Sequence, residues 1–283
     1  MKIYLYNSLL ETSKNNIYEI VNNIDDCDYV FFSCRIKSKQ TGIKYVDENH
    51  EIIKDVYKLV CNHNKKLIYF CGGDRPPIIL PNKENVIVLN TSVNKSTKPF
   101  NEKVVGVVVE DKFSHFINEP KLNIGFVGQK CCGRDKYLKY LENIDNIETN
   151  FILRDKYIHK LKEYHIKEFE NNMNNNLFTF CYRGAGNFSV RFYETLMRGR
   201  IPIVVKTDSI FPFENLINYE NIGIFIEENE LNDKNTLKDL ILNYYNNKTK
   251  DELLNIQKNN REIYLKYFHK DNYFDNIFEN III

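Results

Sequence analysis

The residues best suited to chemistry lie together in a glycine-containing turn, between an apolar strand pattern and a helical pattern. Gly184 and Gly186 let the backbone take conformations that are closed to other residues and approach a ligand closely. Asn187 or Ser189 can cap the following helix, whose free N–H groups and dipole suit an anion, above all a phosphate. Arg183 and Arg191 bracket the turn with forked, permanently charged donors that match a diphosphate. The turn therefore predicts a diphosphate site.

Glu194 adds a carboxylate to this turn. It stands three residues after Arg191, so the two side chains share a face of the expected helix. The carboxylate could accept hydrogen bonds from two ribose hydroxyls while the arginine holds the phosphates, which together make a nucleoside-diphosphate site. The alternative is a surface ion pair beside an ordinary turn, because the motif is neither a Walker A loop nor a G-x-G-x-x-G fingerprint. Spacing alone leaves both interpretations open.

A second candidate element is the segment GQKCCGRD, directly after the strand pattern Asn123–Val127. Gly128 and Arg134 fall in this loop, at the carboxyl end of a strand, where ligands bind in open α/β folds. Arg134 could reach the diphosphate or a second substrate. The alternative is an arginine at the start of a helix that faces solvent.

Short β-branched runs alternate with helical stretches along the whole chain, which indicates an α/β fold with parallel sheets. The first half contains two predicted helices, Ser13–Asn22 and Glu51–His63, the second with one apolar face. Its predicted strands are Lys2–Tyr6, Asp28–Ser33, Lys66–Cys71, Asn85–Leu89 and Val104–Val109.

Glu110–Pro120 is polar and ends in proline, which indicates a linker. After it the alternation restarts, with strands predicted at Asn123–Val127, Thr149–Leu153, Leu177–Tyr182, Ile201–Val205 and Ile222–Ile226. Its predicted helices are Asp155–Met173, Ser189–Arg198, Asn235–Tyr245 and Lys250–Phe268. We therefore expect two Rossmann-like, doubly wound domains, residues 1–115 and 120–283, facing across a cleft at the carboxyl ends of their strands.

Composition limits the classes of function. The chain of 283 residues carries 39 Lys and Arg against 38 Asp and Glu, a balance that argues against a nucleic-acid binder. The longest apolar runs, Val104–Val109 and Ile201–Val205, are strand-sized, so no membrane-spanning helix is expected. The N-terminus turns polar too early for a secretory signal, and the seven cysteines show no C-x-x-C spacing. These features favour reduced thiols and a cytoplasmic location.

The segment Leu177–Glu214 resembles the C-terminal half of the exostosin family of glycosyltransferases. That family has a strand ending in Phe-Cys-Leu, a glycine-rich turn, Ser-x-Arg-x-x-Glu/Asp, Gly-Cys-Ile-Pro-Val and Leu-Pro-Phe. The corresponding residues here are Phe180-Cys181-Tyr182, Gly184, Gly186, Ser189-Val190-Arg191, Glu194, Gly199, Ile201-Pro202-Ile203 and Phe211-Pro212-Phe213-Glu214. Weaker similarity covers Asp28–Phe32 and Ile124–Gly128. The departures are Arg200 in place of a cysteine, and Thr207 in place of an aspartate.

The resemblance implies a GT-B fold and an inverting hexosyl or pentosyl transferase. The domain 120–283 would bind a nucleoside-diphosphate sugar, a UDP-sugar in preference, and the domain 1–115 would face a glycan or glycoprotein acceptor. By position, Ser189 and Arg191 would hold the diphosphate and Glu194 the ribose. Arg183, Gly184, Gly186, Gly128 and Arg134 complete the expected donor site. The alternatives are a catalytically silent nucleotide-binding or partner subunit of the same fold and, less favoured, an epimerase of nucleotide sugars.

An inverting transferase needs a general base for the acceptor hydroxyl. Asp74 is the first candidate, because it follows Cys71-Gly72-Gly73 at the carboxyl end of a strand, where glycines permit a close-approaching loop. The alternative is an aspartate that caps a turn before two prolines. His63, Asp111 and His115 are weaker candidates for the base.

Asp26-Cys27-Asp28 spells the D-x-D metal motif of the other large glycosyltransferase fold. That motif should follow a strand, whereas here it precedes one, so we expect it at the opposite edge of the sheet from the donor. Arginines and a helix terminus can neutralise a leaving diphosphate instead. We therefore predict no cofactor and no essential metal.

We also expect no membrane anchor or stem of the kind that the Golgi members of this family have. Its richness in Asn, Ile and Lys is typical of an AT-rich genome. A member of this kind would suit an AT-rich microbe or a large DNA virus, and in the viral case the host cytoplasm.

Overall fold

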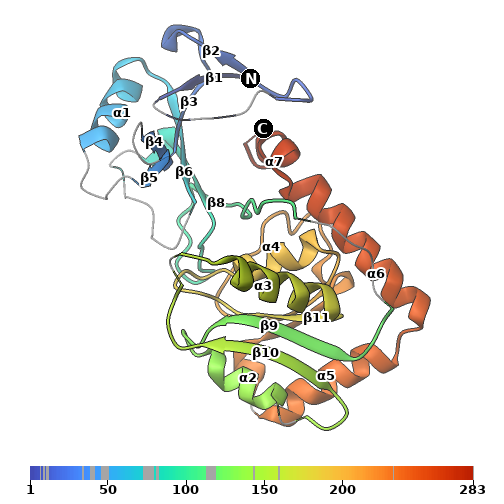
Figure 1. The fold of residues 1–283 in the computed structure, drawn as a ribbon. Helices are drawn as coiled ribbons and strands as arrows, with labels where there is room; N and C mark the ends of the chain where they lie inside the picture. The colour runs from blue at the N-terminus through green and yellow to red at the C-terminus, as the bar shows by residue number, and fades with distance from the viewer. Residues whose placement is uncertain are drawn as a thin grey trace. The chain divides into compact units, whose positions relative to one another are not determined.

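The computed structural model describes residues 1–283 except 7, 9, 11–12, 34, 39–41, 46–50, 73–79, 81–82, 113–118, 143, 159, 232 and 283. The chain forms two compact units, each with its own parallel sheet (Figure 1). Unit 1 combines Met1–Val107 with two later segments, Ser209–Phe213 and Lys270–Ile283, and unit 2 comprises Val108–Asp208 and Glu214–His269. The division thus differs from the single boundary between residues 115 and 120 that the sequence suggested.

Unit 1 is built on a six-stranded parallel sheet with the order β2-β1-β3-β6-β7-β8. Its strands are β1 (Lys2–Leu5), β2 (Glu19–Val21), β3 (Tyr29–Ser33), β6 (Lys66–Cys71), β7 (Val86–Asn90) and β8 (Glu102–Val104). Its other elements are an antiparallel ribbon of β4 (Arg35–Ser38) and β5 (Gly42–Tyr45), the helices α1 (Glu51–Asn62) and α7 (Lys270–Ile277), and the short helical turns η1 (Ile24–Asp26), η2 (Lys83–Asn85) and η6 (Phe278–Ile282).

The two faces of this sheet are covered by segments from opposite ends of the chain. Val30 and Phe32 of β3 point into a core shared with the apolar face of α1. Phe31 points the other way and meets Phe274 of α7 edge-to-face at 5.7 Å. Successive residues of a strand face opposite sides, so β3 supplies both cores in turn. The C-terminal residues therefore complete unit 1.

Unit 2 has a five-stranded parallel sheet with the order β10-β9-β11-β12-β13. The strands are β9 (Asn123–Gln129), β10 (Glu148–Arg154), β11 (Phe178–Cys181), β12 (Ile201–Lys206) and β13 (Ile224–Glu227). The helices are α2 (Arg134–Glu142), α3 (Glu163–Asn175), α4 (Val190–Met197), α5 (Lys234–Asn246) and α6 (Lys250–Ile263), with the turns η3 (Tyr219–Asn221), η4 (Glu228–Glu230) and η5 (Tyr264–Phe268). Figure 1 shows α3 and α4 on one face of the sheet and α2 and α5 on the other.

The strand order of unit 2 fixes where a ligand is expected. Counted along the chain the order is 2-1-3-4-5, so the connections after β9 and β11 leave the sheet toward opposite faces. At such a switch point the loops separate and open a crevice at the carboxyl ends of the strands. The loops after β9 and β11 are the two segments singled out in the sequence.

Asparagines pack α3 tightly against the sheet. Asn172 donates to the backbone carbonyl of Asn150 at 2.6 Å, and Asn123 accepts from the backbone N–H of Leu177 at 2.8 Å. Both asparagines are buried. Gly125 of β9 permits this approach, because a Cβ atom there would lie 2.5 Å from Oδ1 of Asn172. The asparagine-rich segment before β11 is therefore largely helical, and its buried asparagines contribute to packing.

The predicted fold class is confirmed: the chain is an α/β protein of two Rossmann-like units, the composition of a GT-B fold. Three predicted elements were wrong in detail. Ser13–Asn22 is a turn followed by β2 and not a helix, the last strand of unit 1 is Glu102–Val104, and α3 begins at Glu163. The ribbon β4–β5 and α7 had no counterpart in the sequence interpretation. Among the described residues, every helix is too short or too polar to cross a membrane.

Candidate functional site

Arg134 joins the two loops at the switch point of unit 2. Its Nη2 donates to the carbonyl of Arg183 at 2.6 Å, and its Nη1 donates to the carbonyl of Gln129 at 3.3 Å. The guanidinium lies over the ring of Phe126, 5.6 Å from the centroid. Arg134 is half-buried and its guanidinium contacts both loops, so it is not the solvent-facing arginine that the sequence gave as the alternative. One side chain thus ties the exit of β9 to the exit of β11.

Two of the glycines singled out in the sequence stand next to this arginine. A Cβ atom on Gly128 would lie 2.9 Å from the Phe126 ring and 3.7 Å from Nη1 of Arg134. A Cβ atom on Gly184 would lie 3.9 Å from Nη2 of Arg134. Between them in the chain, Gly133 has a φ of +87°, which glycine adopts without strain. The structure therefore brings Gly128, Arg134, Arg183 and Gly184 together.

The turn between β11 and α4 is closed on itself. The N–H of Gly184 donates to the carbonyl of Phe188 at 3.2 Å, and Nη2 of Arg183 donates to the carbonyl of Ala185 at 3.1 Å. Gly186 is buried inside the turn. Ser189 is the residue before α4, and its side chain makes no capping hydrogen bond with the helix. With no acidic residue in the first turn of α4, the serine hydroxyl and the first N–H groups are suited to an anion.

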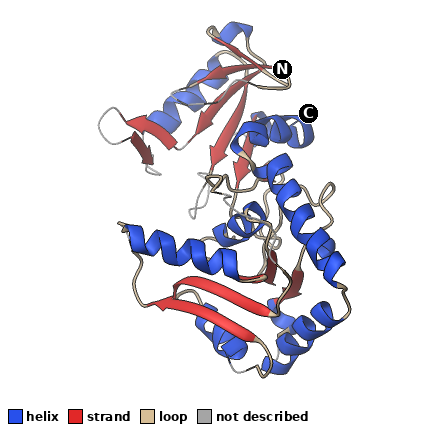
Figure 2. Ribbon diagram, turned by 45° about the vertical axis from the view of Figure 1, so that its right-hand side comes forward, coloured by secondary structure: helices blue, strands red, loops and turns tan. Residues whose placement is uncertain are grey.

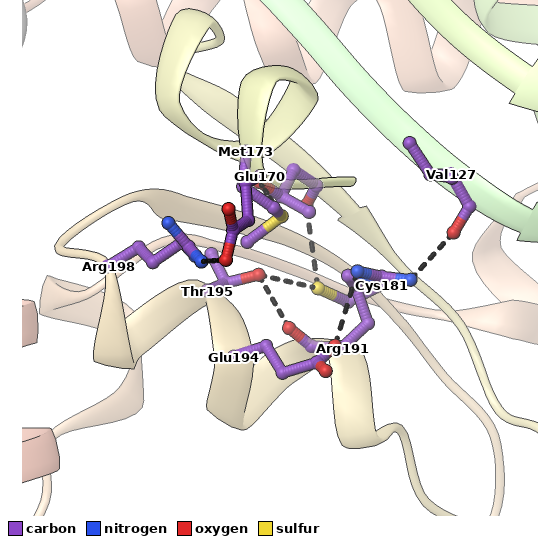
Figure 3. A network of polar contacts seen from close by, with 9 residues as sticks. Val127, Glu170, Met173, Cys181, Arg191, Glu194, Thr195 and Arg198 are labelled. Carbon is purple, nitrogen blue, oxygen red and sulfur yellow. Dashed lines mark hydrogen bonds and ion pairs between the residues drawn. The ribbon is translucent and has the colours of Figure 1, made fainter. Parts of the chain in front are cut away.

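Arg191 points from α4 toward β9 (Figure 3). Its Nη2 donates to the carbonyl of Val127 at 2.6 Å, and its guanidinium stacks on Phe169, 4.3 Å from the ring centroid. Nη1 lies 3.2 Å from Oε2 of Glu194. Arg191 and Glu194 therefore form an ion pair. Because their side chains are only 18% and 25% exposed, it is not the surface ion pair that the sequence gave as the alternative. Its position is half-buried, beside the switch point.

The arginines of the site retain donors for an anion. Nε of Arg134 and both Nε and Nη1 of Arg191 are buried without a hydrogen-bond acceptor among the described residues, although Nη1 stays within ion-pair distance of Glu194. Buried donors left unsatisfied cost free energy, about 1–3 kcal/mol each. Both guanidinium groups lie over Phe126, and Arg183 adds a third positive charge, while Glu194 is the carboxylate paired with Arg191. The local positive charge of the three arginines favours an anionic ligand.

Two residues of the segment that resembles the family, Arg200 and Cys181, are buried in the core. Arg200, which stands where the exostosin family has a cysteine, is fully buried and donates to Oε1 of Gln257 in α6 at 2.8 Å. Burial, and after it the nearby charge of Arg198, lowers the pKa of Arg200 to about 10. The residue therefore joins α6 to β12 and lies outside the site. Cys181 is also inert, because burial raises its thiol pKa to about 12.

The candidates for a base have different outcomes. Asp74 and His115 lie outside the described residues. His63 lies between the end of α1 and the start of β6, and its Nδ1 is 2.9 Å from Oδ1 of Asp25. It therefore stands at the amino edge of the sheet. A base for the acceptor is expected at the carboxyl edge, so His63 is wrongly placed for that role. Both oxygens of Asp111 accept from Arg261, at 2.9 and 2.7 Å, which makes it a structural contact to α6.

The D-x-D motif lies where the sequence placed it. Asp28 precedes β3 and accepts from the backbone N–H of Lys2 at 2.7 Å, so the motif stands at the amino edge of the parallel sheet. That prediction of position is confirmed. Across the described ranges, no three His, Cys, Asp or Glu side chains come together as a group that could hold a metal ion.

Residues 133–241 match the family model of the exostosin GT47 domain. Over this segment the chain is similar to the exostosin GT47 domain. This domain includes Arg134, the turn from Arg183 to Ser189 and the pair Arg191 and Glu194, while β9 and Gly128 precede it. The resemblance drawn from the residues of β11, α4 and β12 is therefore confirmed.

Individual relatives match the chain over short stretches. A probable β-1,4-xylosyltransferase of Arabidopsis thaliana is 27% identical over 78 residues, which are 28% of this chain and 19% of that protein. A probable glucuronosyltransferase of Oryza sativa subsp. japonica is 31% identical over 67 residues, 24% of this chain and 16% of that protein. The chain thus matches less than a fifth of the length of these exostosin relatives.

Solved structures resemble the chain at the level of the fold. The crystal structure of an α1,3-fucosyltransferase is 13% identical, covers 99% of this chain and 90% of its own, and has a TM-score of 0.40. The fold is therefore assigned from the order and direction of the strands in the two sheets of this chain.

Replacing Glu194 by alanine should weaken UDP binding by about ten- to a hundredfold, or about 1.5–3 kcal/mol, if this carboxylate holds the ribose. Titration calorimetry with UDP measures the effect. Glu168→Ala is a matched control, because Glu168 is also half-buried and paired with an arginine, Arg154, but on α3. An unchanged dissociation constant in Glu194→Ala would remove the ribose assignment.

Proposed function

We propose that this protein is a glycosyltransferase that moves a sugar from a nucleoside-diphosphate sugar, a UDP-sugar in preference, to a glycan or glycoprotein acceptor. The observation that carries the proposal is the cradle of Arg134, Arg183, Gly184 and the start of α4 at the switch point of unit 2. This cradle belongs to a segment that matches the exostosin GT47 domain. A diphosphate is the ligand that suits its charge and its open N–H groups.

The proposed chemistry needs charge stabilisation at the leaving group. As the bond between the anomeric carbon and the diphosphate oxygen breaks, negative charge grows on that oxygen. Arg134, Arg183 and Arg191, with the N-terminus of α4, are placed to stabilise this charge by fixed donors and a helix dipole. Ser189 would contact the same diphosphate, and Glu194 would hold the ribose. We propose on this basis that transfer needs no metal.

The acceptor is activated by a base in this proposal. The acceptor hydroxyl attacks the anomeric carbon on the face opposite the diphosphate, which inverts the configuration, and its proton passes to a carboxylate. Asp74 remains our first candidate for that carboxylate, on the strength of its sequence position after Gly72 and Gly73. The acceptor is a sugar hydroxyl, since the family resemblance implies a glycan or glycoprotein.

A thermal-shift panel with UDP, GDP and their sugar conjugates, each with and without EDTA, tests the proposal. A ligand at about a hundred times its dissociation constant should add about 2.7 kcal/mol to the free energy of unfolding. We expect a uracil-specific increase in Tm that survives EDTA. A shift that EDTA abolishes would contradict metal independence, and the absence of a shift with every nucleotide would contradict the donor site.

Release of UDP from a UDP-sugar then separates the possible activities. A transferase releases UDP in proportion to acceptor consumed, whereas an epimerase retains the nucleotide on the sugar. Binding without either reaction, over a panel of sugar acceptors, would favour a catalytically silent subunit.

A further inference from the structure

One carboxylate joins three segments at the carboxyl edge of the sheet in unit 2. Glu228 is the first residue after β13, and its Oε1 accepts from the hydroxyl of Tyr137 at 2.7 Å and from that of Tyr182 at 2.6 Å. Tyr137 belongs to the first turn of α2, after the loop from β9, and Tyr182 directly follows β11. The exits of three strands therefore meet at a single oxygen atom.

Both tyrosines are fixed in the core. Tyr137 and Tyr182 are 3% and 6% exposed, their ring centroids are 5.2 Å apart, and Tyr182 stacks on Phe180. Burial, and then the hydrogen bond to Glu228, raises the pKa of each phenol above its ordinary value. The phenols therefore stay protonated and act as donors. Each needs an acceptor, because a buried hydroxyl without one is unfavourable.

These three residues lie directly beside the arginine cradle. Tyr182 precedes Arg183, whose carbonyl Arg134 binds at 2.6 Å. On the other loop, a Cβ atom on Gly133 would lie 3.7 Å from the hydroxyl of Tyr182, and Gly133 precedes Arg134. Tyr182 thus connects one loop to Glu228 one residue before Arg183, and Tyr137 connects the other loop to it three residues after Arg134.

We propose that Glu228 is a positioning residue, which with Tyr137 and Tyr182 sets the separation of the two loops that receive the diphosphate. This inference rests on the proposed function, since it concerns the same site. The role requires an acceptor oxygen at Oε1 and not a negative charge. Glutamine supplies such an oxygen, while leucine has the size of the side chain and no acceptor. The two substitutions therefore separate positioning from direct contact with the ligand.

The experiment measures dissociation constants of UDP and of inorganic pyrophosphate by calorimetry for the full chain and its variants. We expect Glu228→Leu to weaken both ligands by about tenfold, since two loops lose their common hydrogen bonds, and Glu228→Gln to stay within about twofold of the unmodified protein. Tyr137→Phe combined with Tyr182→Phe, which leaves no buried hydroxyl unpaired, should weaken both ligands by a smaller factor. Tyr264→Phe is the control, because Tyr264 is a buried tyrosine whose hydroxyl donates to Val109 at 2.9 Å, away from the cradle.

Thermal unfolding without ligand is recorded for every variant. If Glu228→Leu does not fold, the variant with both tyrosines replaced by phenylalanine takes its place as the test of the positioning role. Unchanged affinities in Glu228→Leu and in the double variant would overturn the positioning role. A loss in Glu228→Gln equal to that in Glu228→Leu would also overturn it, because the charge would then act on the ligand itself. Absence of binding by the unmodified protein would refute the proposed function as well, so the two failures are distinguishable.

Discussion

Replacing Arg134 by alanine should weaken UDP binding by about a hundredfold, or about 2.7 kcal/mol. The substitution removes a positive charge from the cradle and leaves the carbonyl of Arg183 without the donor that ties it to the loop after β9. Both losses act on the same ligand, which places the expected effect at the upper end of the range given for Glu194→Ala. Titration calorimetry at about 0.15 M salt measures it under conditions where long-range charge effects are screened.

Two further variants make this result specific. Arg134→Lys keeps the charge but cannot donate to two carbonyls in the same planar geometry. Its affinity for UDP should therefore fall between those of the unmodified protein and Arg134→Ala. Arg154→Ala removes an arginine at the end of β10 whose partner is Glu168 of α3, and should leave the affinity unchanged. Equal affinities for Arg134→Ala and Arg154→Ala would place the diphosphate elsewhere.

Asp74→Asn should lower the turnover of a UDP-sugar and its acceptor by about a hundred- to ten-thousandfold, the usual contribution of a general base. Asparagine has the size of aspartate but cannot take the proton of the acceptor hydroxyl. The dissociation constant of UDP should stay the same, since the donor site belongs to unit 2. Steady-state release of UDP, together with calorimetry, measures both quantities.

His63→Gln is the control for this prediction. His63 contacts Asp25 at the amino edge of unit 1, so its loss should leave turnover unchanged. Full activity in Asp74→Asn would show that another group takes the proton. Equal losses in turnover and in UDP affinity would instead indicate that Asp74 acts on the fold or on the donor.

Local patterns carried the prediction of the individual elements. Within β11, α4 and β12 the apolar runs are continuous and the turn is marked by Gly184 and Gly186, so each predicted bound differs from the structure by at most one residue. Ser13–Asn22 was wrong for a physical reason. Its apolar residues are few, and Glu19–Val21 gains a parallel partner in β1, which a helical interpretation cannot include.

Figure 2 shows the alternation of strands and helices that this local information describes. The contribution of α7 to unit 1 is different in kind. Phe274 meets Phe31 across more than two hundred residues of chain, and nothing in the sequence around either residue specifies the other. For that reason the sequence suggested that the C-terminal segment belongs to the second domain.

By itself, the sequence determined the α/β class, the turn with its arginines and glycines, and the resemblance to exostosin glycosyltransferases, because each depends on residues that are close along the chain. The tertiary structure decided that Arg134 holds Arg183, that Arg191 turns toward Val127, and that Glu228 joins two tyrosines. These contacts depend on which strands become neighbours. That order follows from the packing of whole elements, and it brings together residues that lie 46 to 91 positions apart in the chain.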